Sequence, residues 1–361
     1  MTAGSTAAWL PWLAVSSPPD APAFAAARTT IVPRRGRWRR RFGLGLVVAA
    51  VVATASTAGT LISAKSAIDT VSRASDVGEL SGASATIENF LLVGSDSRAN
   101  SDPSSPDYGG IGSEGDVSGS RSDTIMILRR DRQTGAASLL SIPRDLWVAV
   151  PGHGDNRINS AFNFGRDVLV QTVQQTLNIP VHHYVEIDFS GFKSLVDSIG
   201  GVQLCFMYPT RDTNTGLNIP EPGCFLVDGV QALAYARSRH YEEFRDGDWH
   251  EDGTADLGRT KRQRNFVDLA LHTALAEVKA NPFDAGDIMR SGASALTVDE
   301  GLDLVASAGS LRSAVDSGLQ TFALPVVGKT IDGKAVLLLG DGADQVLSFF
   351  RGDGPAPSTT G

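Results

Sequence analysis

The chain has 361 residues, 42% of them hydrophobic, which is enough apolar content for one large domain or two ordinary ones. Its net charge of −8 is unevenly placed. Residues 1–41 hold seven arginines against Asp20, a net charge of +6, so the other residues carry −14. This distribution argues against a nucleic-acid-binding protein, because the acidic body has no basic face to offer to phosphates. A basic N-terminal segment followed by an acidic remainder, called the acidic body below, indicates instead that a membrane separates the two.

An uncharged stretch follows the arginines directly. Residues 42–62 contain no charged side chain, and about 20 apolar residues in a helix span a hydrocarbon core. The positive-inside rule then places residues 1–41 in the cytoplasm and the acidic body outside it. The prolines and alanines of residues 1–41 predict a disordered tail. A cleaved signal peptide is the alternative, because Ala53-Thr54-Ala55 resembles a cleavage site. The apolar run continues past that site, which favours an uncleaved single-pass anchor over residues 42–64.

The acidic body has the alternating pattern of an α/β domain. After a small, polar spacer at 65–86, residues 87–93 form a predicted buried strand, and strand, helix and strand alternate between 184 and 208. Such alternation predicts a three-layer α/β/α sandwich with a central mixed sheet over residues 87–352, followed by a disordered end at 353–361. The other predicted elements are strands at 124–129, 136–142, 146–150, 320–324 and 335–339, and helices at 167–177, 228–237, from 256, at 298–312 and up to 351.

A predicted hairpin carries charged residues at both of its open ends. Two apolar strands flank the polar turn at 131–135, which closes on a glycine. Arg121 and Asp123 enter the first strand, while Arg144 and Asp145 leave the second. Antiparallel pairing puts these ends side by side. Two guanidiniums and two carboxylates are therefore predicted to converge at one edge of the sheet, which building a sheet does not require.

Another carboxylate, Asp96, comes directly after the predicted strand at 87–93. Open α/β sheets bind ligands at this end of their strands, although a solvated aspartate in a turn is the commoner case. Asp96 and Asp123, each at a strand end, could hold a hard divalent cation such as Mg²⁺ and leave coordination positions for water and phosphate.

A second basic cluster closes the helix predicted at 228–237. Arg237 and Arg239 are two residues apart in an extended exit, which points both side chains to one side, although arginines at a helix end also complement its dipole. In the next helix Asp256, Arg259 and Gln263 fall on one face. The other basic residues of that helix, Lys261, Arg262 and Arg264, are predicted to face solvent.

Clustered arginines indicate a strongly negative ligand, because guanidinium groups match phosphate oxygens in a bidentate fashion. The sequence has no G-x-S-x-G motif, no zincin helix and no cysteine and histidine arranged as a nucleophile and base. Arginines with Mg²⁺ and no protein nucleophile are typical of direct phosphoryl transfer, where positioning and charge neutralisation supply most of the catalysis.

The only two cysteines, Cys205 and Cys224, lie in a predicted strand and in a loop rich in proline and glycine. Outside the cytoplasm two thiols are predicted to form a disulfide, which would hold the loop at 209–223. Two cysteines alone cannot build a structural zinc site.

Four motifs together resemble the LytR-CpsA-Psr (LCP) phosphotransferases. They are G-S-D-S-R from Gly94, R-S-D-T from Arg121, S-I-P-R-D from Ser141, and A-L-A-Y-A-R-S-R from Ala232 followed by D-L-G-R-T-K-R-Q from Asp256. The resemblance covers roughly residues 87–271, with a continuation to 351. It implies an α/β/α sandwich anchored by one N-terminal helix. Members of this family take a glycan from a polyprenyl-pyrophosphate carrier and join it to peptidoglycan through a phosphodiester.

The resemblance also implies roles for individual residues. Mg²⁺ would lie at Asp96 and Asp123, with Arg121 beside them as a catalytic residue and one of the two acids as a possible base. Arg157 is a further candidate contact to substrate. The carrier's lipid tail needs an apolar tunnel. The residues implied to grip the pyrophosphate are Arg121, Arg144, Arg237, Arg239, Arg259 and Gln263. The candidates for the tunnel, which core packing explains equally well, are Phe162, Val168, Leu169 and Val173.

One departure from the family pattern is the acidic, aromatic insert at 240–254, which leaves the placement of Asp256 and Arg259 open. The expected partners are a lipid-linked glycan, peptidoglycan and membrane lipid, and not nucleic acid. Two alternatives stay open. One is a pyrophosphatase, in which water replaces the acceptor sugar. The other is a receptor or regulator that binds the lipid pyrophosphate without turnover.

Overall fold

The computed structural model describes residues 71–96, 122–253, 255–280, 294–304, 306–307 and 318–357. By internal contacts the chain separates into residues 1–54 and 55–361, and every described residue belongs to the second unit. The predicted tail and membrane span, residues 1–64, lie outside the described residues. Within the described ranges, no helix has the length and apolar character needed to cross a bilayer.

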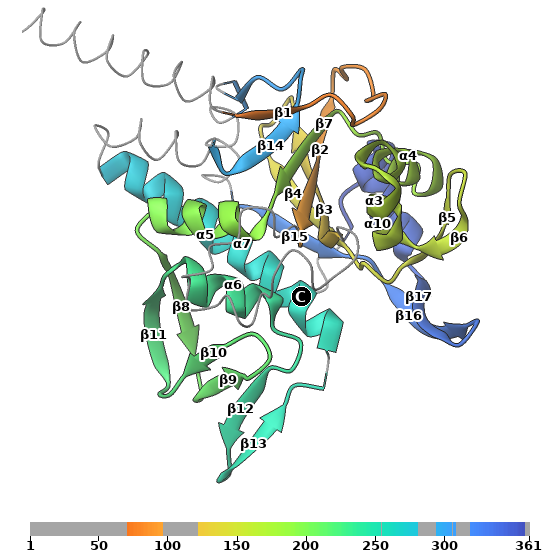
Figure 1. The fold of residues 1–361 in the computed structure, drawn as a ribbon. Coiled ribbons are helices and arrows are strands. Elements are labelled where there is room, and N and C mark those ends of the chain that lie inside the picture. Colours follow the sequence, from red (N-terminus) through yellow and green to blue (C-terminus); the bar gives the residue numbers. More distant parts are fainter. Residues whose placement is uncertain are drawn as a thin grey trace, which may run out of the picture. The chain divides into compact units, whose positions relative to one another are not determined.

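A seven-stranded mixed sheet forms the centre of the domain (Figure 1). β2, β3 and β4 pair antiparallel in sequence, while β7 runs parallel to β2 and β15 parallel to β4. The predicted hairpin and the predicted mixed sheet are therefore confirmed. The strand order is β1 (Ser72–Ala74), β14 (Leu296–Asp299), β7 (His183–Ile187), β2 (Ile87–Ser95), β3 (Ser122–Asp131), β4 (Ala137–Ile142) and β15 (Gln320–Ala323).

One edge of this sheet departs from the sequence prediction. β1 comes from the stretch assigned to a spacer, and it pairs parallel with β14. A helix was predicted over 298–312, but its first residues instead complete β14. The reason is tertiary: Val298 is 0% exposed and packs with Val71 and Phe90, which outweighs the local helical spacing.

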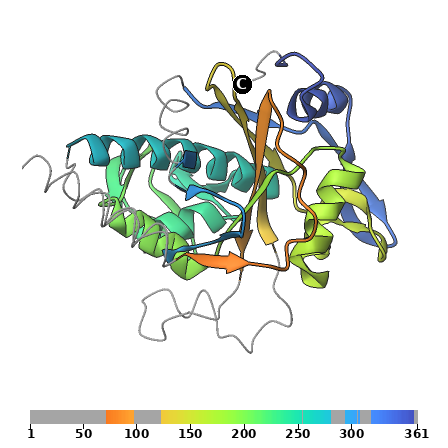
Figure 2. The same ribbon diagram turned by 90° about the horizontal axis from the view of Figure 1, so that it is seen from above.

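Alternate residues of the central strands are buried on opposite faces of the sheet, as expected when both faces are covered. Leu91 and Ile127 pack on the face covered by α4 (Arg166–Thr176) and α10 (Ala343–Arg351). Phe90 and Leu128 pack on the other face, in a cluster that Val267 of α7 (Ala255–Ala280) adjoins. Figure 2 shows these helices on the two sides of the sheet.

Further elements pack around a second apolar cluster beside the sheet. α5 (Phe189–Ser198) and α6 (Gly229–Arg237) lie against each other, and the N-cap predicted for α6 is confirmed, because Asp228 accepts from the backbone N–H of Gln231 at 2.9 Å. The strands of this part are β8 (Val202–Phe206), β9 (Thr210–Asp212), β10 (Leu217–Ile219), β11 (Gly223–Val227), β12 (Glu242–Arg245) and β13 (Asp248–Glu251).

The remaining elements flank the face that α4 and α10 cover. The strand predicted at 146–150 does not continue the central sheet. It forms a separate hairpin with the next strand, and a single bridge links Leu146 to Leu337. These elements are β5 (Trp147–Val150), β6 (Gly154–Arg157), the 3₁₀ helix η1 (Ile158–Ser160), α3 (Ala161–Phe164), β16 (Val326–Ile331) and β17 (Lys334–Leu339).

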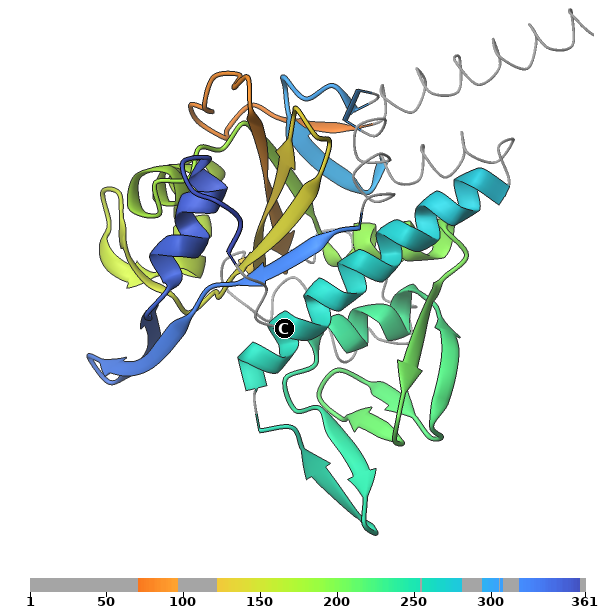
Figure 3. The same ribbon diagram turned by 180° about the vertical axis from the view of Figure 1, so that it is seen from behind.

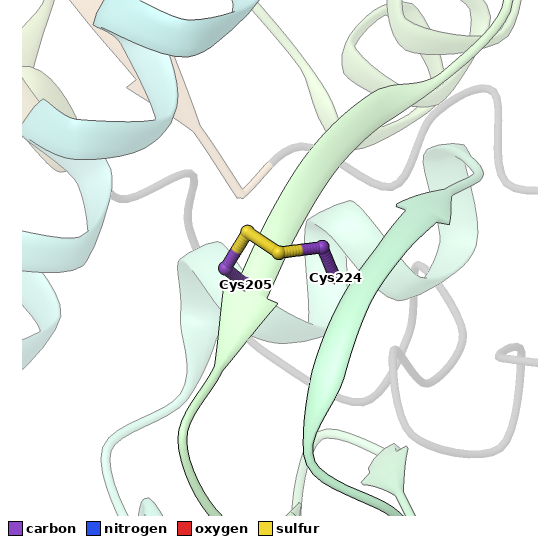
Figure 4. Close-up of a disulfide and its surroundings, with 2 residues drawn as sticks. All are labelled: Cys205 and Cys224. Carbon is purple, nitrogen blue, oxygen red and sulfur yellow. A yellow bond between two sulfur atoms is a disulfide. The ribbon is translucent and has the colours of Figure 1, made fainter. Parts of the chain in front are cut away.

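The predicted disulfide joins Cys205 to Cys224 (Figure 4). Cys224 does not lie in a loop, as the sequence suggested, but in β11, directly opposite Cys205 of β8 in the antiparallel register. The prolines that precede it end before this pairing begins, and Gly223 is the first paired residue of β11, opposite Phe206. The bridge closes a segment of the chain that contains β9 and β10.

Replacing both cysteines, as Cys205→Ser with Cys224→Ser, should lower the free energy of unfolding by about 2–4 kcal/mol, because the unfolded chain loses a crosslink between residues 19 apart. Urea unfolding of the two proteins measures the difference. Since both cysteines are exposed, wild type treated with a thiol reductant should unfold at the midpoint of the variant. Equal midpoints for untreated wild type and variant would contradict a stabilising role.

Candidate active site

Asp96 leaves the sheet at an irregular point between β2 and β3. Gly94 lies opposite Thr124, but Ser95 lies opposite Ser122, so β3 contains one extra residue, Asp123. This is a β-bulge, a feature that bends a strand and redirects a side chain, and that is frequent next to active sites. The structure thus brings the backbone of both predicted acids to one end of the sheet. The sequence did not predict this bulge.

Two buried serines line the same point. Ser95 is 1% exposed and Ser122 is 0% exposed. The hydroxyl group of Ser122 has no hydrogen-bond partner within the described part of the chain. An unsatisfied buried hydroxyl costs about 1–3 kcal/mol, so its oxygen is suited to a ligand that supplies the missing contact.

The residue types at this point have the donor chemistry of the cation that the sequence predicted. Two aspartates and a hydroxyl are hard oxygen donors, the kind that Mg²⁺ prefers. Of Asp123 only the backbone is described. Among the described side chains, no group of three or more His, Cys, Asp or Glu is arranged to hold a metal ion. A cation at this point would therefore complete its shell with water and ligand oxygens, as Mg²⁺ commonly does.

β4 brings Arg144 to this end of the sheet, because Ile142 pairs with Ile125 near the start of β3. The side chain of Arg144 is 14% exposed, and its Nε lies 3.7 Å from Asp145 Oδ2. The other oxygen of Asp145 lies 3.4 Å from Nε of Arg157, which also donates from Nη2 to the carbonyl oxygen of Ala335 at 2.7 Å. Arg157 is therefore held beside Arg144 through a shared carboxylate.

Arg237, the last residue of α6, lies near the same end of the sheet. Ile187, the last residue of β7, pairs with Gly94, and Phe189 follows two residues later. The guanidinium carbon of Arg237 lies 4.6 Å from the centroid of the Phe189 ring, a cation–π contact. Figures 1 and 3 both show β2 ending on the side of α6 and α7. Residues about 140 positions apart thus meet at one edge.

The first turns of α7 pack against the exit of α6. Gln263 donates from Nε2 to the carbonyl oxygen of Ala236 at 3.1 Å, and Arg259, one turn earlier on the same face, is 3% exposed. α7 also contacts β4. These contacts bring Arg259 and Gln263 to the part of α6 that carries Arg237. The side chain of Asp256 lies outside the described residues.

The prediction that Arg262 faces solvent is wrong. Its guanidinium donates to Asp252 Oδ2 and to the carbonyl oxygen of Ser238, both at 2.6 Å, and lies 4.5 Å from the centroid of the Tyr241 ring. The insert covers this face of α7, which a helical wheel leaves open. Lys261 is exposed as predicted, while Arg264 is half-buried, and burial lowers its pKa.

Asp212, which the sequence did not single out, holds the turn that carries Arg239. Its buried Oδ2 accepts from the hydroxyl of Ser238 at 2.7 Å and from the backbone N–H groups of Arg239 and His240, both at 3.0 Å. Burial raises the pKa of Asp212, but these hydrogen bonds and one from Asn214 outweigh it, so the pKa lies below the ordinary value. Sequence offered no signal, since acceptor and donors are more than 25 positions apart.

The predictions for Arg239, Arg121 and the four tunnel candidates have different outcomes. Arg239 is exposed at the end of this turn. Arg121 lies outside the described residues. The tunnel candidates Phe162, Leu169 and Val173 are buried in the core between the sheet and its helices, and Val168 packs against them, so core packing accounts for all four.

The family profile described as LytR_cpsA_psr matches residues 48–347. The chain belongs to this family. LcpB of Corynebacterium glutamicum, named as a probable cell wall biosynthesis protein, is 38% identical over 66% of this chain. TagU of Oceanobacillus iheyensis, named as a polyisoprenyl-teichoic acid–peptidoglycan teichoic acid transferase, is 29% identical over 70% of this chain. The chain spans 54% of the length of LcpB, about half, and 71% of TagU.

Solved structures of the family share the fold. TagT (YwtF) of Bacillus subtilis, with a bound octaprenyl pyrophosphate lipid, aligns with a TM-score of 0.52 at 21% identity and covers 78% of this chain and 98% of its own. The mixed sheet of this LytR_cpsA_psr protein is thus the sheet of its family.

Replacing Asp212 by asparagine should lower the free energy of unfolding at neutral pH by about 1–3 kcal/mol, because an amide N–H₂ would face buried N–H donors. The pKa of Asp212 is depressed on folding, so its contribution is complete above the unfolded value, near 3.8, and disappears as pH falls through the lower folded value. The difference between wild type and Asp212→Asn should therefore shrink only below about pH 4. Urea unfolding across the acid range measures it.

Asp228→Asn is the matched control, because asparagine still caps α6 at its other end. It should change stability by only a few tenths of a kcal/mol. A constant difference between wild type and Asp212→Asn down to pH 2 would rule out the buried carboxylate as its source.

Proposed function

We propose that this protein is a Mg²⁺-dependent phosphotransferase that moves a glycan from a polyprenyl-pyrophosphate carrier to peptidoglycan and forms a phosphodiester link. The observation that carries the proposal is the meeting of Arg144, Arg157 and Arg237, from separate parts of the chain, at the sheet end where Asp96 leaves β2. Guanidinium groups match phosphate oxygens in a bidentate fashion, so a diphosphate is the ligand that such a group of arginines suits.

The names of relatives support the same chemistry. TagU is a transferase from a polyisoprenyl carrier to peptidoglycan, and TagT has been solved with a polyprenyl pyrophosphate. The conclusion for this chain is a carrier lipid of the same class. The identity of the glycan stays open, because none of the described residues of the site is assigned to sugar recognition.

In the proposed reaction a hydroxyl of the acceptor sugar attacks the phosphorus that carries the glycan. The bond from that phosphorus to the bridging oxygen breaks, polyprenyl phosphate leaves, and the proton of the hydroxyl passes to Asp96 or Asp123. Arg144, Arg237 and Arg259 orient the diphosphate and neutralise the charge of the transition state. When bound, Mg²⁺ at Asp96 and Asp123 would supply further charge neutralisation.

The proposal includes an anchor at residues 42–64 with the catalytic domain outside the cytoplasm. A membrane anchor suits the substrate, because the polyprenyl tail confines the diphosphate to the bilayer surface. The disulfide between Cys205 and Cys224 is consistent with an oxidising compartment.

Arg237→Ala and Arg144→Ala should each reduce transfer about 10²- to 10³-fold, because each removes a fixed positive group from the phosphate. The assay follows polyprenyl phosphate release and glycan attached to peptidoglycan, with purified lipid-linked glycan as donor. Lys261→Ala, an exposed cation on α7, is the control and should keep wild-type activity. Glycan phosphate released without attachment to peptidoglycan would indicate a pyrophosphatase. Unchanged rates in folded arginine variants would refute the proposal.

Asp96→Asn should remove the Mg²⁺ dependence of the remaining activity, because a neutral amide is a weak ligand for a hard cation. Wild-type activity should vanish with a chelator and return with added Mg²⁺. Titration of Mg²⁺ into the protein, followed by heat release, measures binding without turnover. Asp344→Asn, an exposed carboxylate at the start of α10, should bind Mg²⁺ like wild type. Full activity in chelator would exclude the metal.

A further inference from the structure

The insert at 240–254 folds as the hairpin of β12 and β13, which extends a small sheet of order β10, β9, β12 and β13. Thr210 and Asp212 of β9 point inward and are 0% exposed. Residues in between therefore point outward, and cross-strand partners share a face. In Figure 3 the hairpin projects beyond α6 and α7. The residues of the outward face are Arg211, Asn218, Glu242, Phe244, Trp249 and Glu251.

An aromatic pair occupies the centre of this outward face. Phe244 lies directly opposite Trp249, with ring centroids 5.4 Å apart. The guanidinium of Arg211 stacks 4.0 Å from the centroid of the Trp249 ring, and Nε of Arg211 donates to Glu242 at 2.7 Å. Phe244 remains 39% exposed. The neighbouring residues thus hold an exposed aromatic surface in place, so a ligand would not have to order it.

Planar polar groups surround the aromatic pair. Glu251 Oε1 lies 2.9 Å from Nδ1 of His240, and the side chains of Asn218 and Glu242 lie on the same face. Carboxylates, amides and imidazoles provide paired donors and acceptors at fixed geometry. Apolar rings flanked by such groups suit a sugar chain, whose rings present C–H faces to an aromatic surface and hydroxyl groups to the polar rim.

The position and charge of this face select the kind of sugar chain. His240 follows Arg239, which the sequence predicts to bind the pyrophosphate, and Asp212 accepts from both backbone N–H groups, so the face begins next to that arginine. The insert contains six acidic residues and one basic residue, Arg245, which disfavours a polyanionic glycopolymer.

We propose that the outward face of β10, β9, β12 and β13 binds the sugar backbone of the acceptor peptidoglycan strand and leads it to the arginines. This inference rests on the proposed function, because it assigns the second substrate of that reaction. It makes Phe244 and Trp249 positioning residues for the acceptor. They contact neither the diphosphate nor the metal.

Binding of soluble, uncrosslinked peptidoglycan strands to the full-length protein in detergent tests the proposal without any turnover. Phe244→Ala and Trp249→Ala should each weaken the Kd about tenfold, whereas Phe244→Tyr, which keeps the ring, should bind like wild type. Phe164→Ala is the matched control. It removes a phenyl group that is 45% exposed on α3 and stacked on His153, and it should leave the Kd unchanged.

Transfer assays then separate the two proposals. With a saturating donor, Phe244→Ala should raise the KM for the acceptor strand and leave the KM for the lipid-linked donor unchanged. If the strands bind as predicted but no variant transfers glycan, the proposed function fails while the binding face stands. Equal strand binding by wild type and Phe244→Ala overturns the binding face, as does an equal loss in Phe164→Ala. Preferential binding of free donor glycan overturns its assignment to the acceptor.

Discussion

The pairing of β2 with both of its neighbours at Gly94 is the constraint on which the candidate site depends. Gly94 lies opposite Thr124 of β3 and opposite Ile187 of β7. A Cβ at Gly94 would lie 3.0 Å from Cβ of Thr124, closer than ordinary packing allows. The missing side chain lets the strands stay together up to the bulge. Three neighbouring strands then carry Asp96, Asp123 and Phe189 at or just past this end of the sheet.

From that point, electrostatics explains the rest of the arrangement. Contacts of two kinds hold three of its positively charged side chains. Arg144 and Arg157 share the carboxylate of Asp145, and Arg237 lies over an aromatic ring. The cation–π contact and the shared carboxylate fix these guanidiniums before a ligand binds, so an anion with several negative oxygens would not have to order them.

The parts that could be predicted from the sequence follow from local patterns. The strands from β2 to β4 contain nearly continuous apolar runs, and the antiparallel pairing of β3 with β4 makes it possible to predict that Asp123 and Arg144 share an edge. The N-cap of α6 is equally local. The bulge at Asp123 could not be predicted, because it depends on how two strands pair. Asp212 and Arg262 could not be either, since each depends on a segment far away in the chain. β14 was missed because its burial against Val71 outweighs its helical spacing.

The insert shows how a segment outside the family pattern alters the surroundings of a site. Its return strand buries Arg262 through Asp252, and its first residues share the carboxylate of Asp212 with the turn that carries Arg239. Hydrogen bonds therefore connect the hairpin to α7, which carries Arg259, and to the end of α6, which carries Arg237. A substrate bound to the hairpin is in this way linked, through hydrogen bonds already formed, to the groups proposed to bind the phosphate.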